Sequence, residues 1–183
     1  PLDRAAALGH LRPRMTPGVE LLDRDHYRRT LEVCGNPGVI EVDLSGDEAH
    51  LELTAHLPTF DSIIDDVARI RSMFGLDDDV RSAEDHLLAD PLLAPVVRRQ
   101  PGLRVVGGWD RFETAVRVIV GQQVSVVGAT TITGRIADRH GARLPGEVLG
   151  LDRLFPTPAA LVDLDADGLG MPGSRVATIR ALA

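Results

Sequence analysis

The sequence predicts an α+β protein in which a small antiparallel sheet with covering helices precedes a helical second part. Residues 39–44 and 49–55 alternate between apolar and polar side chains, which is typical of strands that bury one face. Residues 109–120 instead repeat apolar side chains every three or four positions, as an amphipathic helix does. Strand-like alternation nearly vanishes after the aspartates at 77–79. We therefore place a domain boundary there, between residues 1–76 and 80–183.

The N-terminal part is expected to contain a helix, a set of strands and a second helix. Residues 2–12 predict a short helix, which Pro13 and Pro17 end. A strand over residues 28–33 precedes the two alternating strands, with turns at 36–38 and 45–47 between them. The histidines at 50 and 56 are then strand residues near solvent.

The second helix of this part is expected to cover the sheet. Thr59 is its predicted N-cap and Gly75 its end. Its apolar stripe consists of Ile63, Ile64, Val67, Ile70 and Phe74. Its acids, Asp61, Asp65 and Asp66, are interpreted as a solvated face, with Asp65 paired to Arg69.

The second part is expected to be helical. A capping box at Ser82 opens a helix through residue 88, and Asp90 caps another through residue 99. The β-branched residues of 122–140 also allow a strand. A helix is favoured there, because Arg139, His140 and Gly141 are typical of a helix C-terminus. Gly128 and Gly134 would permit close packing of that helix, and further helices begin near residues 158 and 174.

The composition excludes several classes of protein. The formal net charge of −7 argues against a general phosphate-binding surface. Eight arginines cluster in residues 98–143. They leave open a local DNA site, although solvated helix faces are the commoner outcome. Cys34 is the only cysteine, so neither a disulfide nor a cysteine-based zinc site forms within the chain. His86 follows two acids, which indicates helix capping more than a metal site. We expect a cytoplasmic protein without metal, cofactor or membrane span.

No catalytic group can be assigned from residue types alone. No nucleophile–base–orienter trio is apparent, and both common glycine-rich phosphate-binding motifs are missing. The residue types therefore indicate two small domains and no chemistry.

One stretch resembles a known family. Residues 103–129, LRVVGGWDRFETAVRVIVGQQVSVVGA, resemble the helix–loop–helix of AlkA-type DNA-3-methyladenine glycosylases II, within the helix-hairpin-helix glycosylase superfamily. Further matches occur in the family's order: LGHLRPRMTPGVE, DHYRRTLEV, LFPTPAAL and LGMPGSRVATIRAL. The resemblance therefore covers most of the chain.

The resemblance implies an enzyme that flips an alkylated base out of double-stranded DNA and hydrolyses its N-glycosidic bond. It assigns a DNA wedge loop to Gly121, Gln122, Gln123, Val124 and Ser125. Gln123 takes the tip, where the family has Leu. His10, Gln122 and Val126 match positions of the damaged-base pocket. Two plainer interpretations stay open: Gln123 as a helix-capping amide and His10 as an ordinary surface residue.

The sequence also departs from the family. The family continues into a hairpin of the LPGxGxxTA kind, which holds a DNA phosphate, and then into a catalytic Asp. Met171, Pro172, Gly173 and Ser174 lack the second glycine of that hairpin. We therefore expect no catalytic residue in these 183 residues, the catalytic Asp beyond Ala183, and little excision by the chain alone.

Two other functions stay open. One is a non-catalytic interaction or regulatory module of the same fold. The other is binding of a small ligand or partner by the N-terminal domain. Fusion to an upstream regulator domain and association with the bacterial nucleoid are further expectations of the resemblance.

Overall fold

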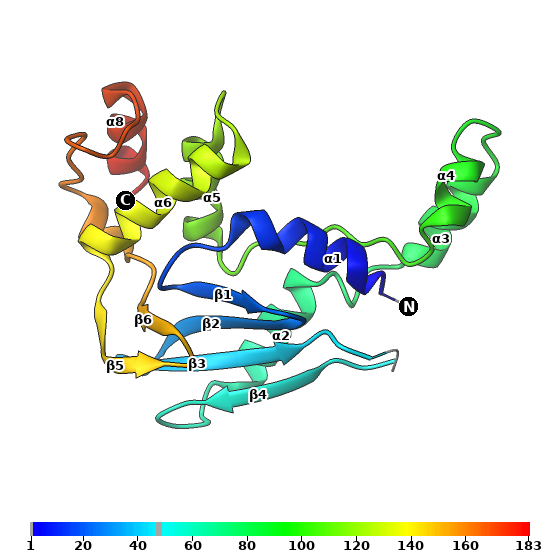
Figure 1. The fold of residues 1–183 in the computed structure, drawn as a ribbon, viewed down its shortest axis with the longest axis horizontal. Coiled ribbons are helices and arrows are strands. Elements are labelled where there is room, and N and C mark those ends of the chain that lie inside the picture. The colour runs from blue at the N-terminus through cyan, green and yellow to red at the C-terminus, as the bar shows by residue number, and fades with distance from the viewer. Residues whose placement is uncertain (1, 47–48) are drawn as a thin grey trace.

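A four-stranded antiparallel sheet forms the centre of the N-terminal part (Figure 1). The computed structural model describes residues 2–46 and 49–183. Neighbouring strands in sequence are neighbours in the sheet, in the order β1-β2-β3-β4. The strands are β1 (Glu20–Asp23), β2 (His26–Val33), β3 (Asn36–Asp43) and β4 (Glu52–His56). The predicted alternation is confirmed. Tyr27 faces Val42 and Leu53 on the covered side, and Arg28 faces Glu41 and Thr54 on the other.

Two helices pack on the covered face of this sheet. Helix α1 (Arg4–Leu11) is capped by Asp3, whose carboxylate accepts from the Ala6 amide at 2.9 Å. Helix α2 (Ile63–Met73) lies behind the sheet in Figure 1 and ends at Gly75, which has φ +60°. Their buried side chains join those of β2 and β3 in one core: Leu11, Tyr27, Leu31, Val33, Ile40, Val42, Leu44, Ile70, Met73, Phe74 and Trp109.

A second core holds the C-terminal helices together. Helices α5 (Arg111–Gly121), α6 (Val126–His140), α7 (Pro158–Leu161) and α8 (Gly173–Leu182) surround it. Its buried members are Val116, Val120, Ile132, Ile136, Leu161, Leu164, Leu169, Met171, Val176 and Ile179. Helix α6 confirms the helical interpretation of residues 126–140, because its buried positions 132, 133, 136 and 137 follow the helical period.

The α+β class is confirmed, but residues 80–183 are not wholly helical. Strands β5 (Arg143–Val148) and β6 (Leu151–Arg153) form a hairpin that packs beside β2. The Thr30 hydroxyl donates to the Arg153 carbonyl at 2.8 Å, and this bond ties the hairpin to the sheet. Periodicity does not predict this hairpin, because β5 contains Pro145 and Gly146, residues that are rare inside strands.

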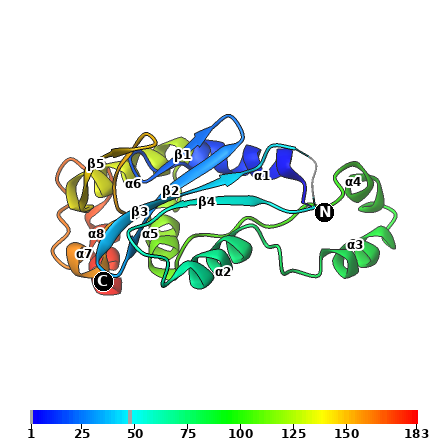
Figure 2. The same ribbon diagram turned by 90° about the horizontal axis from the view of Figure 1, so that it is seen from below.

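A helical hairpin projects from the rest of the molecule (Figure 2). It consists of α3 (Val80–Leu88) and α4 (Ala94–Arg99), in which Ala94 alone is buried. Several large apolar side chains in and beside it are exposed, Leu92 at 83% and Val105 at 85% being the extremes. The N-terminus lies near this projection, and the C-terminus lies at the opposite end (Figure 1).

Two turn predictions need comment. The turn predicted at 36–38 is wrong, because Cys34 and Gly35, both with positive φ, reverse the chain. Pro37 is accommodated in β3 because β4 does not extend to that position. The turn predicted at 45–47 includes Asp47, which lies outside the described residues.

The helix starts also differ from the predictions. The Thr59 hydroxyl donates to Asp61 at 2.7 Å instead of capping, so α2 begins four residues later. Asp79, not Ser82, caps α3, with its carboxylate accepting from the Ser82 amide.

The acids of α2 are not uniformly solvated. Asp66 is only 2% exposed, accepts a hydrogen bond from the Ser62 hydroxyl at 2.9 Å, and pairs with Arg69 at 4.0 Å. The predicted Asp65–Arg69 pair is therefore replaced by an i,i+3 pair.

Candidate nucleic-acid interface

A short exposed loop, here the 121–125 loop, joins α5 to α6. Helix α5 ends at Gly121, and Gln122 turns to an extended conformation with φ −61° and ψ 124°. Gln123 has φ +56°, a left-handed conformation that costs a non-glycine residue about 1 kcal/mol or more. Both glutamine side chains are exposed. The loop therefore holds Gln123 outward between two anchored helices.

Ser125 performs the capping in this loop. Its hydroxyl accepts from the Gly128 amide at 3.1 Å and closes the N-terminus of α6. This leaves the Gln123 amide without a capping role.

A cavity of about 210 Å³ lies beside the loop. The loop supplies Gly121 and Val124, and the residue after it, Val126, also lines the cavity. The remaining walls come from Arg14, Arg117, Ala129, Thr130 and Thr133. Complete ligand pockets usually enclose roughly 300–1,000 Å³. The described residues thus form a partial site with apolar walls, two hydroxyls and two guanidinium groups.

The N-terminal segment reaches this cavity because it docks on α6. Residues Arg12–Arg14 form a short 3-10 turn, η1, and the Thr130 hydroxyl donates to the Pro13 carbonyl at 2.9 Å. A Cβ on Gly134 would lie 3.1 Å from Pro17 Cδ, so this glycine allows the close approach. Close packing at Gly134 is thus confirmed, although its partner is a loop proline. Gly128 faces only its own cap, since a Cβ there would lie 3.3 Å from Ser125 Oγ.

Four buried polar side chains and the partly buried Arg117 lie between the sheet and α5. They are here called the buried ion cluster: Glu20, Tyr27, Arg29, Glu113 and Arg117. Arg29 is 1% exposed and donates to Glu113 at 2.8 Å and to Glu20 at 3.3 Å. It also lies 4.5 Å from the ring centroid of Trp109. Two carboxylates thus balance two guanidinium groups, which is what burial of charge requires.

The cluster alters the acid–base properties of its members. Burial alone would raise the pKa of Glu20. Arg117, Arg29 and the Tyr27 hydroxyl outweigh that effect and hold this pKa below its ordinary value of 4.5. Burial beside Glu20 raises the pKa of Tyr27 well above 10.0. The charged form of Glu20 and the neutral form of Tyr27 are therefore the native ones.

We predict that Glu20 contributes to acid unfolding. Its folded pKa is lower than its unfolded one, so its stabilisation is fully present above the unfolded value and is lost as pH falls through the folded value. The free energy of unfolding in urea should decrease below about pH 4.5 with a slope that Glu20→Gln makes shallower. An unchanged slope in Glu20→Gln would contradict this assignment.

The sequence-predicted site residues fall into three groups. Gly121, Val124 and Val126 line the cavity, whereas Gln122, Gln123 and Ser125 form its exposed border. His10 lies apart, exposed in the last turn of α1, where its carbonyl accepts from Arg14 at 2.7 Å. Partial burial and Arg14 lower the pKa of His10, which favours its neutral ring. The structure thus brings the loop residues together and places His10 one turn before Arg14.

Sequence reasoning missed Arg14, Arg117 and Thr133 as cavity residues. Arg14 lies inside the LGHLRPRMTPGVE match, which was the available signal. Arg117 was grouped with arginines on solvated faces. That interpretation suits the exposed Arg98, Arg99 and Arg111, but it is wrong for Arg117, whose side chain is 25% exposed and paired to two buried carboxylates.

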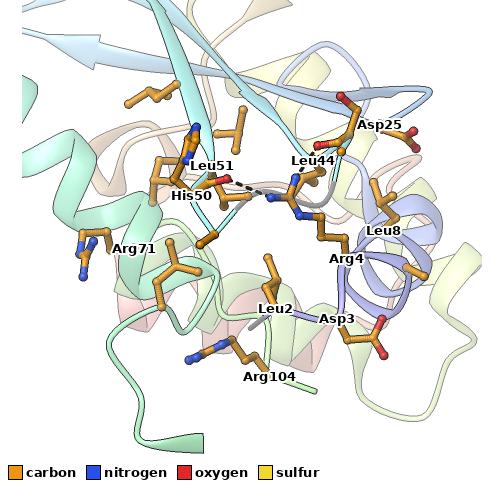
Figure 3. A pocket seen from close by; sticks show the side chains of 18 of the residues that line it. Leu2, Asp3, Arg4, Leu8, Asp25, Leu44, His50, Leu51, Arg71 and Arg104 are labelled. Carbon is orange, nitrogen blue, oxygen red and sulfur yellow. Dashed lines mark hydrogen bonds between the residues drawn. The ribbon is translucent and has the colours of Figure 1, made fainter. Parts of the chain in front are cut away.

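A larger cleft lies elsewhere, between the start of α1, the sheet and α2 (Figure 3). Its floor is apolar, with Leu44 and Leu51, and Arg4 lies on its rim. The Arg4 guanidinium donates to the main-chain carbonyls of Ser45 and His50. Arg71 pairs with Asp77, and Arg104 donates to the Gly75 carbonyl. These cations thus bind the protein's own chain.

Two searches bear on other functions. Within residues 2–46 and 49–183, no three His, Cys, Asp or Glu side chains come together as a metal site would need. None of the helices in the described part of the chain is long and apolar enough to cross a membrane.

Comparisons with known proteins identify related sequences. The family model for the AlkA N-terminal domain matches residues 1–110. A probable bifunctional transcriptional activator/DNA repair enzyme AlkA from Mycobacterium tuberculosis is 33% identical over 174 residues, which is 95% of this chain and 35% of the relative. DNA-3-methyladenine glycosylase 2 from Escherichia coli is 31% identical over 191 residues, which covers the whole chain and 63% of the relative. The chain thus spans less than two thirds of the length of either relative.

Solved structures share the fold. A 3-methyladenine DNA-glycosylase from Archaeoglobus fulgidus matches 99% of this chain and 63% of its own, with a TM-score of 0.82 at 18% identity. An 8-oxoguanine glycosylase/lyase from Clostridium acetobutylicum, in complex with double-stranded DNA, matches 90% of this chain and 53% of its own, with a TM-score of 0.62 at 17% identity.

Proposed function

Because the chain belongs to the AlkA N-terminal domain family, we propose that it is part of a base-excision repair glycosylase for alkylated bases, with the 121–125 loop as its DNA wedge. One observation supports this most directly. Gln123 is held outward at positive φ, between two helices with buried faces and beside a partial cavity. Exposed side chains in a strained, well-anchored loop are typical of functional positions.

The wedge would stabilise DNA from which one base has been removed from the stack. Flipping a base costs a few kcal/mol, and a side chain inserted from the minor groove offsets part of that cost. Gln123 would fill the gap with its methylene groups and offer amide hydrogen bonds to base edges. The N-terminus of α6 lies beside the loop and favours nearby phosphate groups. His10 would stack on the displaced base, and Gln122 and Val126 would line its pocket.

We further propose that these 183 residues alone do not cleave the glycosidic bond. The sequence has no LPGxGxxTA motif followed by an aspartate, the part to which the family resemblance assigns phosphate binding and oxocarbenium stabilisation. The chain's contribution would then be fold, wedge and part of the pocket.

Base unstacking by the purified chain tests the wedge. A duplex oligonucleotide carrying one 2-aminopurine becomes more fluorescent when that base leaves the stack. We expect the chain to raise this fluorescence and Gln123→Ala to lower the rise several-fold. Gln100→Ala is the matched control, because Gln100 is also exposed but follows α4, far from the loop.

The outcomes separate the two proposals. A rise that is equal in wild type and Gln123→Ala would overturn the wedge assignment. Release of 3-methyladenine from alkylated DNA is measured in parallel. Robust release by the 183-residue chain would overturn the proposal that bond cleavage needs residues outside it.

Two associations are also proposed. Fusion to an upstream regulator is supported by the name of the M. tuberculosis relative, a bifunctional transcriptional activator/DNA repair enzyme. Action on chromosomal DNA in the bacterial cytoplasm follows from the proposed substrate.

A further inference from the structure

Arg117 connects α5 to η1 and β1, two neighbouring segments that lie 103 and 97 positions earlier in the sequence. Its Nε donates to Glu113 Oε1 at 2.9 Å, and its Nη2 donates to the same oxygen at 2.6 Å and to Glu20 Oε2. Its Nη1 donates at 3.0 Å to the main-chain carbonyl of Arg14, 103 residues earlier. All three nitrogens of one guanidinium are therefore engaged, in fixed directions, with α5, the start of β1 and the end of η1.

The same side chain lines the cavity beside the 121–125 loop. Arg117 and Arg14 both contribute to its wall, together with Gly121 and Val124 from the loop. Arg117 lies on α5, one helical turn before Gly121. The hydrogen bond to the Arg14 carbonyl therefore joins the two walls of the cavity, one formed by η1 and the other by the end of α5.

We propose that Arg117 is a positioning residue that sets the distance between the η1 wall, which contains Arg14, and the 121–125 loop. The inference rests on the proposed wedge function and names the residue that holds the two walls of the cavity beside the wedge. Carboxylates on the far side of the guanidinium hold it in place: Glu113 is 2% exposed and Glu20 is 6% exposed. Because these carboxylates fix the guanidinium, the positions of β1 and α5 determine the position of the Arg14 carbonyl that the guanidinium binds.

Arginine is required for this role by its shape. Three separate nitrogens in one plane reach three acceptors at once, whereas a lysine has a single nitrogen at the end of its stem. Lysine at this position would keep the positive charge that Glu20 and Glu113 need. It would lose the simultaneous bond to the Arg14 carbonyl.

The test compares Arg117→Lys with Arg29→Lys. Both changes remove a guanidinium from the buried ion cluster and keep its charge. Arg29, however, donates to Glu20, Tyr27, Thr30 and Glu113, which all lie outside η1, and it is not among the residues that line the cavity. We expect Arg117→Lys to lower the 2-aminopurine fluorescence rise at least threefold at saturating protein, and Arg29→Lys to keep it. The fluorescence is compared at a temperature at which circular dichroism shows that every variant is folded. Arg117→Met repeats the test with the hydrogen bond wholly removed.

Amide hydrogen exchange without DNA gives an independent readout. In Arg117→Lys and Arg117→Met the amides of residues 11–16 should exchange several-fold faster, while those in Arg29→Lys keep the wild-type rate. Equal fluorescence and exchange in the Arg117 and Arg29 variants would overturn the positioning role. A wild-type chain that unstacks no base would overturn the proposed function, and the exchange comparison would still decide whether Arg117 positions η1.

Discussion

Replacing Arg29 with methionine should lower the free energy of unfolding by about 3–5 kcal/mol, the range observed when one partner of a buried ion pair is removed. Arg29 is buried between Glu20, Glu113 and Trp109, and methionine fills similar space without a charge. Two carboxylates would then share one remaining guanidinium, that of Arg117. Domains of this size are stable by only about 5–15 kcal/mol, so the effect is a large share of the total. Urea unfolding followed by circular dichroism measures it.

An exposed arginine provides the control. Arg71 at the end of α2 pairs with Asp77, with 50% and 60% of the two side chains exposed. Arg71→Met should lower the free energy of unfolding far less, because surface pairs contribute little to stability. If both variants lost the same stability, burial of the cluster would not be the cause. Adding Glu113→Gln to Arg29→Met should recover part of the loss, because it removes the unpaired buried charge.

Replacing Gly141 with alanine should cost about 1–3 kcal/mol, the range of overpacked sites. A Cβ at this position would lie 2.5 Å from the Ala137 carbonyl oxygen and closer still to that of Leu154. Both obstacles are main-chain atoms, one in the last turn of α6 and one just after β6, so relief requires the backbone at the end of α6 to change shape. The backbone itself is not strained, since φ is −74°. The expected loss is therefore steric, and thermal unfolding detects it as a lower Tm.

Gly146 is the matched control for this prediction. It lies five residues later, in β5, and a Cβ there would meet nothing within 4 Å. Gly146→Ala should leave stability unchanged or raise it by about 0.4–1 kcal/mol through the unfolded chain. A Gly141→Ala protein as stable as Gly146→Ala would show that the end of α6 yields easily.

The predicted parts of the fold are those that rest on local periodicity. Alternation predicts strands over residues 39–44 and 49–55, where the structure has β3 (Asn36–Asp43) and β4 (Glu52–His56). Apolar spacing of three and four predicts α5. The turn at residues 34–35 was not predicted, because cysteine has no turn preference. Asn36 and Pro37 do have one, and they placed the predicted turn too late. Hairpin β5–β6 was not predicted, because Pro145 and Gly146 are rare inside strands and interrupt the alternation of β5. The burial of Asp66 depends on Ser62 and on its tertiary surroundings, which no local pattern reveals.

The candidate site divides in the same way. The 121–125 loop was predicted, since a glycine and two amides interrupt two helical patterns. The buried ion cluster was not, because the contacts that link the sheet to α5 join residues 84 and 97 positions apart, Arg29 with Glu113 and Glu20 with Arg117. Charges at that separation look independent in a sequence, and only the packing of α5 on β1 and β2 makes them partners.

The buried ion cluster also limits which substitutions this sequence can accept during evolution. Its two positive and two negative side chains balance, so a single substitution that alters charge leaves an unpaired charge in the interior. Substitutions at positions 20, 29, 113 and 117 should therefore appear in relatives as coupled changes, an acid lost together with an arginine. Positions in the N-terminal sheet and in helix α5 would then share one evolutionary history, although they lie in different parts of the chain.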